Sequence, residues 1–224
     1  YPHIGFDEMH FIDYFDQTKI LREYITDQEL YDKIIKRYEN RKNNEKLFFM
    51  GITMQNHGGY TETYDNFPEN YYKVGRSYTD ANQYLSLVHE SDEAVKNLIS
   101  YFSKVDDPVE IIFFGDHQPS LNSNFYPILN GKGLTGLTED ELEKLYTVPF
   151  FIWTNYDTPE ETVDITSLDY LSTMALERAG IELPAYNKFL ADMQEVVPAI
   201  NSRGYYSKSK GCYLHIDEAE GEEK

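Results

Sequence analysis

The sequence predicts an α/β layered fold. Three short apolar runs, at 47–54, 109–114 and 148–153, lack the alternation of a half-exposed strand and are typical of buried strands. Segments with apolar residues at helical spacing separate these runs. Buried strands separated by helices are typical of layered α/β proteins.

Composition narrows the class of protein. The chain has 224 residues, 15% of them aromatic, and a formal net charge of −19. It is too aromatic for a disordered chain, and its negative field repels nucleic acid and anionic membrane surfaces at long range. With Cys212 as its single cysteine, it forms no internal disulfide. No apolar run is long enough to span a bilayer, and the start at Tyr1 without a Met suggests part of a longer protein.

Two long helices are expected in the first half. Thr26 and Glu29 have the form of a capping box, with a hydroxyl at N-cap and a carboxylate at N3, so a helix should cover about 27–40. Apolar residues at helical spacing predict a second helix from Thr79 to about residue 103.

Shorter elements are expected in the second half. Thr138 and Glu141 form another capping-box pattern, which should open a short helix to about Tyr146. The remaining elements are a helix over 166–179 closed by Gly180, a short helix over 184–196 and an edge strand over 211–216.

Two of the predicted strands end on loops that carry histidine. His57 follows the first strand, and Asp116 and His117 follow the second. In layered α/β sheets, ligands bind beyond the carboxyl ends of the strands. These two loops are therefore the candidate functional residues.

Asp116 and His117 combine a hard anionic oxygen with a borderline nitrogen. Such a pair suits Mn²⁺, Zn²⁺ or Mg²⁺. Beyond Gly115 the backbone no longer has to be extended, so both side chains can turn toward one ion. A catalytic metal usually takes three protein ligands, so the pair alone is an incomplete site. The alternative is a loop turn in which Asp116 caps the backbone.

His57 also has two interpretations. The His57-Gly58-Gly59 stretch can form a tight turn in which glycine supplies a positive φ. Alternatively, His57 donates to a substrate oxygen and the glycines let the backbone approach closely. Three tyrosines nearby are packing or loop residues, or one of them lines a pocket: Tyr60, Tyr71 and Tyr72.

Several motifs follow one another in the order of a known family. The chain resembles the carboxyl-terminal half of the extracellular catalytic domain of lipoteichoic acid synthase-like phosphoglycerol transferases. These belong to the sulfatase branch of the alkaline phosphatase superfamily. The motifs are YPHIGFDEMHFIDYF (1–15), FFMGITMQNHGGYT (48–61), YLSLVHESDEAVKNLISYF (84–102), EIIFFGDHQPS (110–120), VPFFIWTN (148–155) and SLDYLSTMALERAGIELPAYNKFL (167–190).

The resemblance implies a mostly parallel central sheet flanked by helices, with a small antiparallel sheet at the carboxyl end. The N-terminal part of that fold is expected to lie outside this chain. The implied organisation is catalytic domain over 1–155, a helical and small-sheet subdomain over 156–216, and an acidic tail over 217–224.

The same resemblance assigns roles to the candidate residues. Asp116 and His117 match two metal ligands, with manganese the usual metal and zinc or magnesium possible, and His57 matches a substrate-binding histidine. The nucleophilic threonine and a further acidic ligand would come from outside this chain. Neither Thr53 nor Thr61 is assigned as the nucleophile.

The implied reaction is phosphoglycerol transfer through a phosphothreonine intermediate. The donor would be an anionic phospholipid headgroup, and the acceptor a glycerol-phosphate polymer or an envelope glycan. The full-length protein would act on the extracellular face of the membrane, held there by segments outside this chain, and the isolated chain would have no turnover.

Alternative functions remain. The stretch NHGGY (56–60) differs from the aromatic-proline version common in lipoteichoic acid synthases. A sulfatase, a phosphodiesterase or a phosphoethanolamine transferase of the same superfamily is compatible with the residues present. A non-catalytic module with a structural or binding role is also compatible with them.

Overall fold

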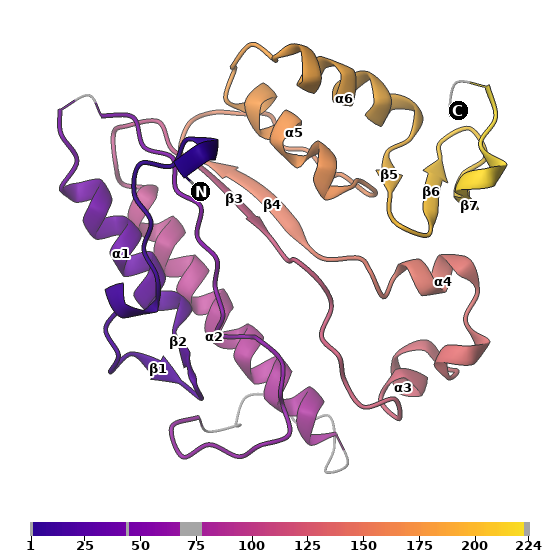
Figure 1. Cartoon of the computed structure of the whole chain (residues 1–224), viewed down its shortest axis with the longest axis horizontal. Helices are drawn as coiled ribbons and strands as arrows, with labels where there is room; N and C mark the ends of the chain where they lie inside the picture. The colour runs from indigo at the N-terminus through magenta and orange to yellow at the C-terminus, as the bar shows by residue number, and fades with distance from the viewer. Residues whose placement is uncertain (1, 44, 68–77, 222–224) are drawn as a thin grey trace. The chain divides into compact units, whose positions relative to one another are not determined.

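The computed structural model describes residues 2–43, 45–67 and 78–221, drawn in colour in Figure 1. The chain divides into two compact units. Unit 1 comprises 1–105 and 119–133, and unit 2 comprises 106–118 and 134–224. The sequence-based boundary at residue 155 concerns the family's domains and stays a prediction.

Unit 1 is built on two helices that lie side by side (Figure 1). They are α1 (Asp27–Glu39) and α2 (Thr79–Phe102), and they confirm the two helices predicted for the first half. Leu87 of α2 is fully buried and packs with Tyr60 and Phe67. The smaller elements are 3₁₀ helices at Pro2–Ile4 and Ile12–Tyr14, the antiparallel strands β1 (Ile20–Leu21) and β2 (Tyr24–Ile25), and α3 (Tyr126–Asn130).

The N-terminus of α1 forms only half of the predicted capping box. Thr26 Oγ1 accepts a hydrogen bond from Glu29 N at 3.2 Å, as expected. The reciprocal bond is not needed, because Thr26 N already donates to Lys19 O at 3.0 Å. The Glu29 carboxylate instead accepts from Asp16 N at 2.9 Å and pairs with Lys33 at 3.3 Å. The side chain at N3 therefore fixes the preceding segment onto α1.

The apolar run 47–54 was predicted to be a buried strand, and this prediction is wrong. The run forms no strand, and Phe48 and Ile52 are 77% and 61% exposed. The run does pack on α1 at Gly51, where a Cβ would meet Leu30 at 3.0 Å. A run without alternation becomes a buried strand only when neighbouring strands pair with it. None of the described residues pairs with it in that way.

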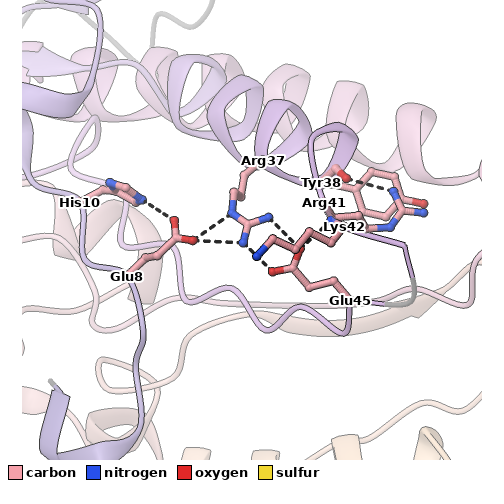
Figure 2. Close-up of polar contacts among 7 residues, drawn as sticks. All are labelled: Glu8, His10, Arg37, Tyr38, Arg41, Lys42 and Glu45. Carbon is pink, nitrogen blue, oxygen red and sulfur yellow. Dashed lines mark hydrogen bonds and ion pairs between the residues drawn. The ribbon is translucent and has the colours of Figure 1, made fainter.

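An ion-pair network ties the start of the chain to α1 (Figure 2). Arg37 Nη2 lies 3.0 Å from Glu8 Oε1 and 2.8 Å from Glu45 Oε1. Lys42 N donates to Glu45 Oε2 at 2.8 Å, and His10 Nε2 lies 3.2 Å from Glu8 Oε2. The Arg37 guanidinium thus binds both the segment that precedes α1 in the sequence and the segment that follows it.

Unit 2 combines two small sheets with packed helices. Strands β3 (Glu110–Phe114) and β4 (Phe150–Thr154) pair antiparallel over their whole length. The second sheet has the order β5-β6-β7, and its strands are β5 (Ala199–Ile200), β6 (Gly204–Ser207) and β7 (Cys212–His215). The helices are α4 (Glu139–Glu143), α5 (Leu171–Arg178) and α6 (Ala185–Val196), with 3₁₀ helices at Leu134–Gly136, Leu168–Tyr170 and Ile216–Glu218.

The α/β class and the small antiparallel sheet at the carboxyl end are confirmed. All sheets among the described residues are antiparallel, so the mostly parallel central sheet is not formed by these residues themselves. Strand β3 is also less buried than expected, with Ile112 36% and Phe114 44% exposed. The reason is that β3 and β4 form a sheet of only two strands among the described residues. A strand is fully buried only when other layers cover both faces of its sheet.

The predicted helix signals in unit 2 are confirmed. Thr138 Oγ1 accepts from Glu141 N at 3.4 Å, and Thr138 N donates to Glu141 Oε2 at 2.7 Å, which completes the capping box of α4. Gly180 closes α5 with φ +67°, and Ile181 N donates back to Leu176 O at 2.9 Å. A left-handed residue at this position is the expected helix stop.

Candidate functional site

Asp116 and His117 lie directly beyond β3. Gly115 N donates to Pro149 O at 3.1 Å, so the hydrogen-bond ladder between β3 and the β4 segment extends one residue past β3. A Cβ at Gly115 would meet Val148 Cβ at 3.0 Å. Glycine therefore eases the close approach of the two segments, and the pair is held at the end of the two-stranded sheet.

The side chains of Asp116 and His117 converge. His117 Nε2 lies 3.6 Å from Asp116 Oδ2, and His117 Nδ1 lies 2.9 Å from Gln118 O. A carbonyl oxygen only accepts, so Nδ1 carries the hydrogen of this contact, and in the neutral ring Nε2 would present its lone pair. Gln118 Nε2 in turn donates to Thr147 O, which fixes this loop. In that neutral tautomer, two acceptor atoms face each other.

This arrangement fits two ligands of a divalent cation. Metal bonds of about 2.1 Å place neighbouring ligand atoms roughly 3.0–3.4 Å apart, so a small adjustment of the 3.6 Å separation suffices. The side chains are 85% and 76% exposed, which leaves room for further ligands. Within residues 2–43, 45–67 and 78–221, no group of three His, Cys, Asp or Glu side chains could hold a metal. A complete site needs ligands beyond this pair.

The alternative interpretation, in which Asp116 caps the backbone of a turn, is supported by a hydrogen bond. Its Oδ1 accepts from His117 N at 2.8 Å, as a capping aspartate would. That bond occupies one carboxylate oxygen and leaves Oδ2 directed at the imidazole. The turn and the two-ligand arrangement are therefore compatible with each other.

His57 belongs to unit 1, in a tight turn that follows the apolar run. His57 N donates to Met54 O at 3.0 Å, and Gly59 has φ +93°. The imidazole is exposed, and its Nδ1 lies 3.0 Å from Tyr24 Oη. No hydrogen bond to a described residue uses Nε2, so this atom can meet a ligand.

A buried polar network attaches the start of the His57 loop to α1 and α2. Ser91 Oγ donates to Asp27 Oδ2 at 2.6 Å, and it accepts from Asn56 Nδ2 at 2.8 Å and from Gln55 Nε2 at 3.2 Å. Burial raises the pKa of Asp27 to about 6, although the Ser91 hydrogen bond opposes this shift. The two residues before His57 are thus held by α1 and α2.

Sequence reasoning missed Arg22. This side chain is only 4% exposed, and its Nη2 donates to the carbonyl oxygens of His57 at 2.7 Å and Gln55 at 2.9 Å. A single arginine between Leu21 and Glu23 has the pattern of an exposed turn, so the sequence carries no signal of its burial.

Tyr60 packs in the core, as one of the two interpretations expected, and it also borders a hollow. It is 6% exposed, and its hydroxyl donates to Asn56 O at 2.7 Å. Tyr71 and Tyr72 lie outside the described residues. The hollow has a volume of about 290 Å³ and is bordered by Tyr60, Thr61, Thr79, Asp80, Ser120 and Asn122, beside Gly59.

His57 and the Asp116–His117 pair belong to different units. Their convergence on one substrate stays a prediction.

Among the described helices, none combines the length and the apolar character that a membrane crossing requires.

Comparison with known proteins identifies the family. A family model described as sulfatase matches residues 1–181. The chain belongs to the sulfatase family. The sulfatase branch that the motifs indicated is thereby confirmed, and with it the membership of an enzyme family.

Two curated relatives of this sulfatase-family chain come from Rhizobium meliloti (strain 1021). One is a putative cyclic beta-1,2-glucan modification protein, 27% identical over 77% of this chain and 28% of its own length. The other is the capsular polysaccharide biosynthesis protein RkpI, 33% identical over 54% of this chain and 21% of its own length. The chain therefore spans between a fifth and a third of the relatives it matches.

A solved structure shares the fold. It is the Streptococcus pyogenes phosphoglycerol transferase GacH in complex with sn-glycerol-1-phosphate, with a TM-score of 0.60 and 19% identity. The match covers 82% of this chain and 45% of GacH. At this identity the likeness supports the fold.

Proposed function

We propose that this sulfatase-family chain forms part of a metal-dependent phosphoglycerol transferase of cell-envelope polymer synthesis, with a phospholipid headgroup as donor. The observation that carries the proposal is the Asp116–His117 pair beyond β3, where a carboxylate oxygen and an imidazole nitrogen face each other at 3.6 Å. Two facing acceptors are stabilised by a cation between them. The sulfatase match and the fold shared with GacH support this reaction class.

Asp116 and His117 would hold the cation, with Mn²⁺ expected and Zn²⁺ or Mg²⁺ as alternatives. The cation would supply Lewis-acid stabilisation of the phosphate charge. The Gln118 carbonyl fixes the His117 tautomer, which keeps Nε2 available as a ligand. The nucleophilic threonine would come from outside this chain, so the isolated chain would have no turnover.

His57 would bind the substrate phosphate. Its exposed Nε2 can donate to a phosphate oxygen when Nδ1 accepts from the Tyr24 hydroxyl at 3.0 Å. A Cβ at Gly58 or Gly59 would meet nothing within 4 Å, so the turn leaves space for a ligand above it. Donation to the phosphate oxygens would stabilise the charge that develops there.

The acceptor would be an envelope glycan rather than a glycerol-phosphate polymer. The hollow beside Gly59 is bordered by hydroxyl, amide and carboxylate groups such as Thr61, Asp80 and Asn122, which suit a neutral polyol. The names of the two curated relatives also refer to glucan and polysaccharide. Action at the extracellular face of the membrane, through segments outside this chain, completes the proposal.

Sulfate-ester hydrolysis is the second candidate, because the matching family model is described as sulfatase. The two reactions differ in product. The product of the complete gene should release diacylglycerol from phosphatidylglycerol if it is a phosphoglycerol transferase, and inorganic sulfate from a sulfate ester if it is a sulfatase.

Manganese binding tests directly whether the Asp116–His117 pair holds a metal. Electron paramagnetic resonance should show Mn²⁺ bound to the wild-type protein, with weaker binding after Asp116→Ala or His117→Ala. Asp106→Ala, an exposed aspartate in the same unit, is the control. In the product of the complete gene, either ligand variant should lower turnover by about 100-fold or more. Unchanged Mn²⁺ affinity in both ligand variants would refute the metal site.

A further inference from the structure

Arg22 adopts an unusual backbone conformation. It lies in the turn between β1 and β2, and its φ of +55° is the one positive value among the described non-glycine residues. The left-handed region is unfavourable for a residue with a Cβ, and turns there usually carry Gly, Asn or Asp. A strained arginine at this position suggests that its side chain serves a purpose.

The guanidinium gathers the carbonyl groups of the His57 loop. Nη2 donates to His57 O at 2.7 Å and to Gln55 O at 2.9 Å, and Nη1 lies 3.5 Å from Gly59 O. Nη1 also donates to Gln83 Oε1 of α2 at 3.1 Å. Alternate residues of the loop thus direct their carbonyl oxygens at one cation.

No carboxylate among the described residues pairs with Arg22. Its charge is met by carbonyl dipoles and by the rings of Tyr24, Tyr60 and Tyr64, at 5.5, 5.5 and 5.9 Å from the guanidinium carbon. Its Nε has no partner among the described residues. Burying a charge is costly unless it is compensated, and dipoles compensate it without cancelling it. The charge of Arg22 is therefore not neutralised by a carboxylate of the described residues.

The hairpin that carries Arg22 also holds the imidazole. Tyr24 of β2 lies two residues further on, and its hydroxyl is 3.0 Å from His57 Nδ1. One short hairpin therefore fixes both the backbone and the ring of His57.

We propose that Arg22 is a positioning residue for His57. It holds the backbone of the loop at 55, 57 and 59. It also places positive charge close to the backbone of His57, whose imidazole would bind an anionic phosphate. The inference rests on the proposed role of His57 as a phosphate ligand. An arginine is required because its planar fork reaches several carbonyls at once, whereas a lysine ammonium is a point charge.

Two substitutions separate the fork from the charge. Arg22→Lys keeps the charge and removes the fork, and Arg22→Met removes both while retaining much of the apolar stem. Arg41→Met is the matched control, because Arg41 lies in the same unit and stacks on Tyr38 at the end of α1. All three variants are first checked by circular dichroism for folding.

The first readout needs no ligand. Amide hydrogen exchange at 55–60 should be about tenfold faster in both Arg22 variants, because the bonds to a charged donor are lost, and unchanged in Arg41→Met. The ring signals of His57, assigned with His57→Ala, should move at the same time. If neither Arg22 variant alters exchange or ring signals, Arg22 does not position the loop. If Arg22→Met fails to fold, Arg22→Lys decides by the same criterion.

The second readout uses inorganic phosphate and sn-glycerol-1-phosphate, followed by the His57 ring signals of the wild-type protein. Arg22→Met should weaken binding by about tenfold, and Arg22→Lys by less, because its charge remains. Equal affinity in wild type and a folded Arg22→Met would overturn the role of the charge. If neither probe moves the wild-type His57 signals, the proposed phosphate role of His57 fails, and the exchange rates still decide whether Arg22 holds the loop.

Discussion

Ser91 Oγ donates a hydrogen bond of 2.6 Å to the buried carboxylate of Asp27, and this contact joins the middle of α2 to the first residue of α1. Asp27 is 3% exposed, and its Oδ1 has no partner among the described residues. Burial therefore disfavours the charged form relative to water, which agrees with the rise of its pKa to about 6.

This raised pKa predicts that stability falls as pH rises from about 4 to about 6. In that range the folded protein keeps the Asp27 proton, whereas the unfolded chain has lost it. The shift from 3.8 to about 6 corresponds to about 3 kcal/mol at most. Urea unfolding at several pH values should show the loss. Asp27→Asn should remove it, while Asp32→Asn, an exposed residue on the same helix, should retain it. A slope that persists in Asp27→Asn would contradict this assignment.

Glu45 predicts the opposite pH dependence. Hydrogen bonds from Arg37, and then from Lys42 N, lower its pKa from 4.5 to about 2. The Arg37–Glu45 pair (Figure 2) therefore contributes stability above about pH 4.5 that is lost as pH falls toward 2. Glu45→Gln should flatten this part of an acid-unfolding curve. Glu93→Gln, which removes an exposed pair with Lys96, should change the curve little. Identical acid curves for Glu45→Gln and wild type would count against the network.

Gly115 predicts a steric link between strand packing and the candidate metal pair. Its substitution by Ala would place a Cβ 3.0 Å from Val148 Cβ, an overpacking that typically costs about 1–3 kcal/mol. Gly115→Ala should lower the melting temperature and weaken Mn²⁺ binding, since Asp116 is the next residue. Gly133→Ala should be neutral, because a Cβ there meets nothing within 4 Å. A Gly115→Ala protein with unchanged melting and Mn²⁺ affinity would show that the close approach is unimportant.

The exposed apolar run predicts self-association. Phe48, Met50 and Ile52 are 77%, 59% and 61% exposed, within a segment that has no paired strand among the described residues. Such segments bind other apolar surfaces. Light scattering should show mass rising with protein concentration, and Phe48→Asn with Ile52→Asn should reduce this rise. Ile216→Asn, an isolated residue that is 54% exposed, is the control. A wild-type protein that stays monomeric at high concentration would refute the prediction.

The candidate site was only partly predictable. The order of an apolar run, a glycine and an Asp-His pair is local, so Asp116 and His117 could be found from the sequence, and the structure brings their side chains to 3.6 Å. The Arg22 contacts span 33 to 61 residues of sequence. No local pattern encodes such a contact, and a lone arginine is normally exposed.

The sequence by itself determined α1, α2, the α4 capping box and the Gly180 helix stop, because helical spacing and capping act within a few residues. The tertiary structure decided which strands pair, in which direction, and which apolar runs become strands. Strand formation depends on partners far along the chain, so the run at 109–114 became β3 through its pairing with β4, and the equally apolar run at 47–54 formed no strand.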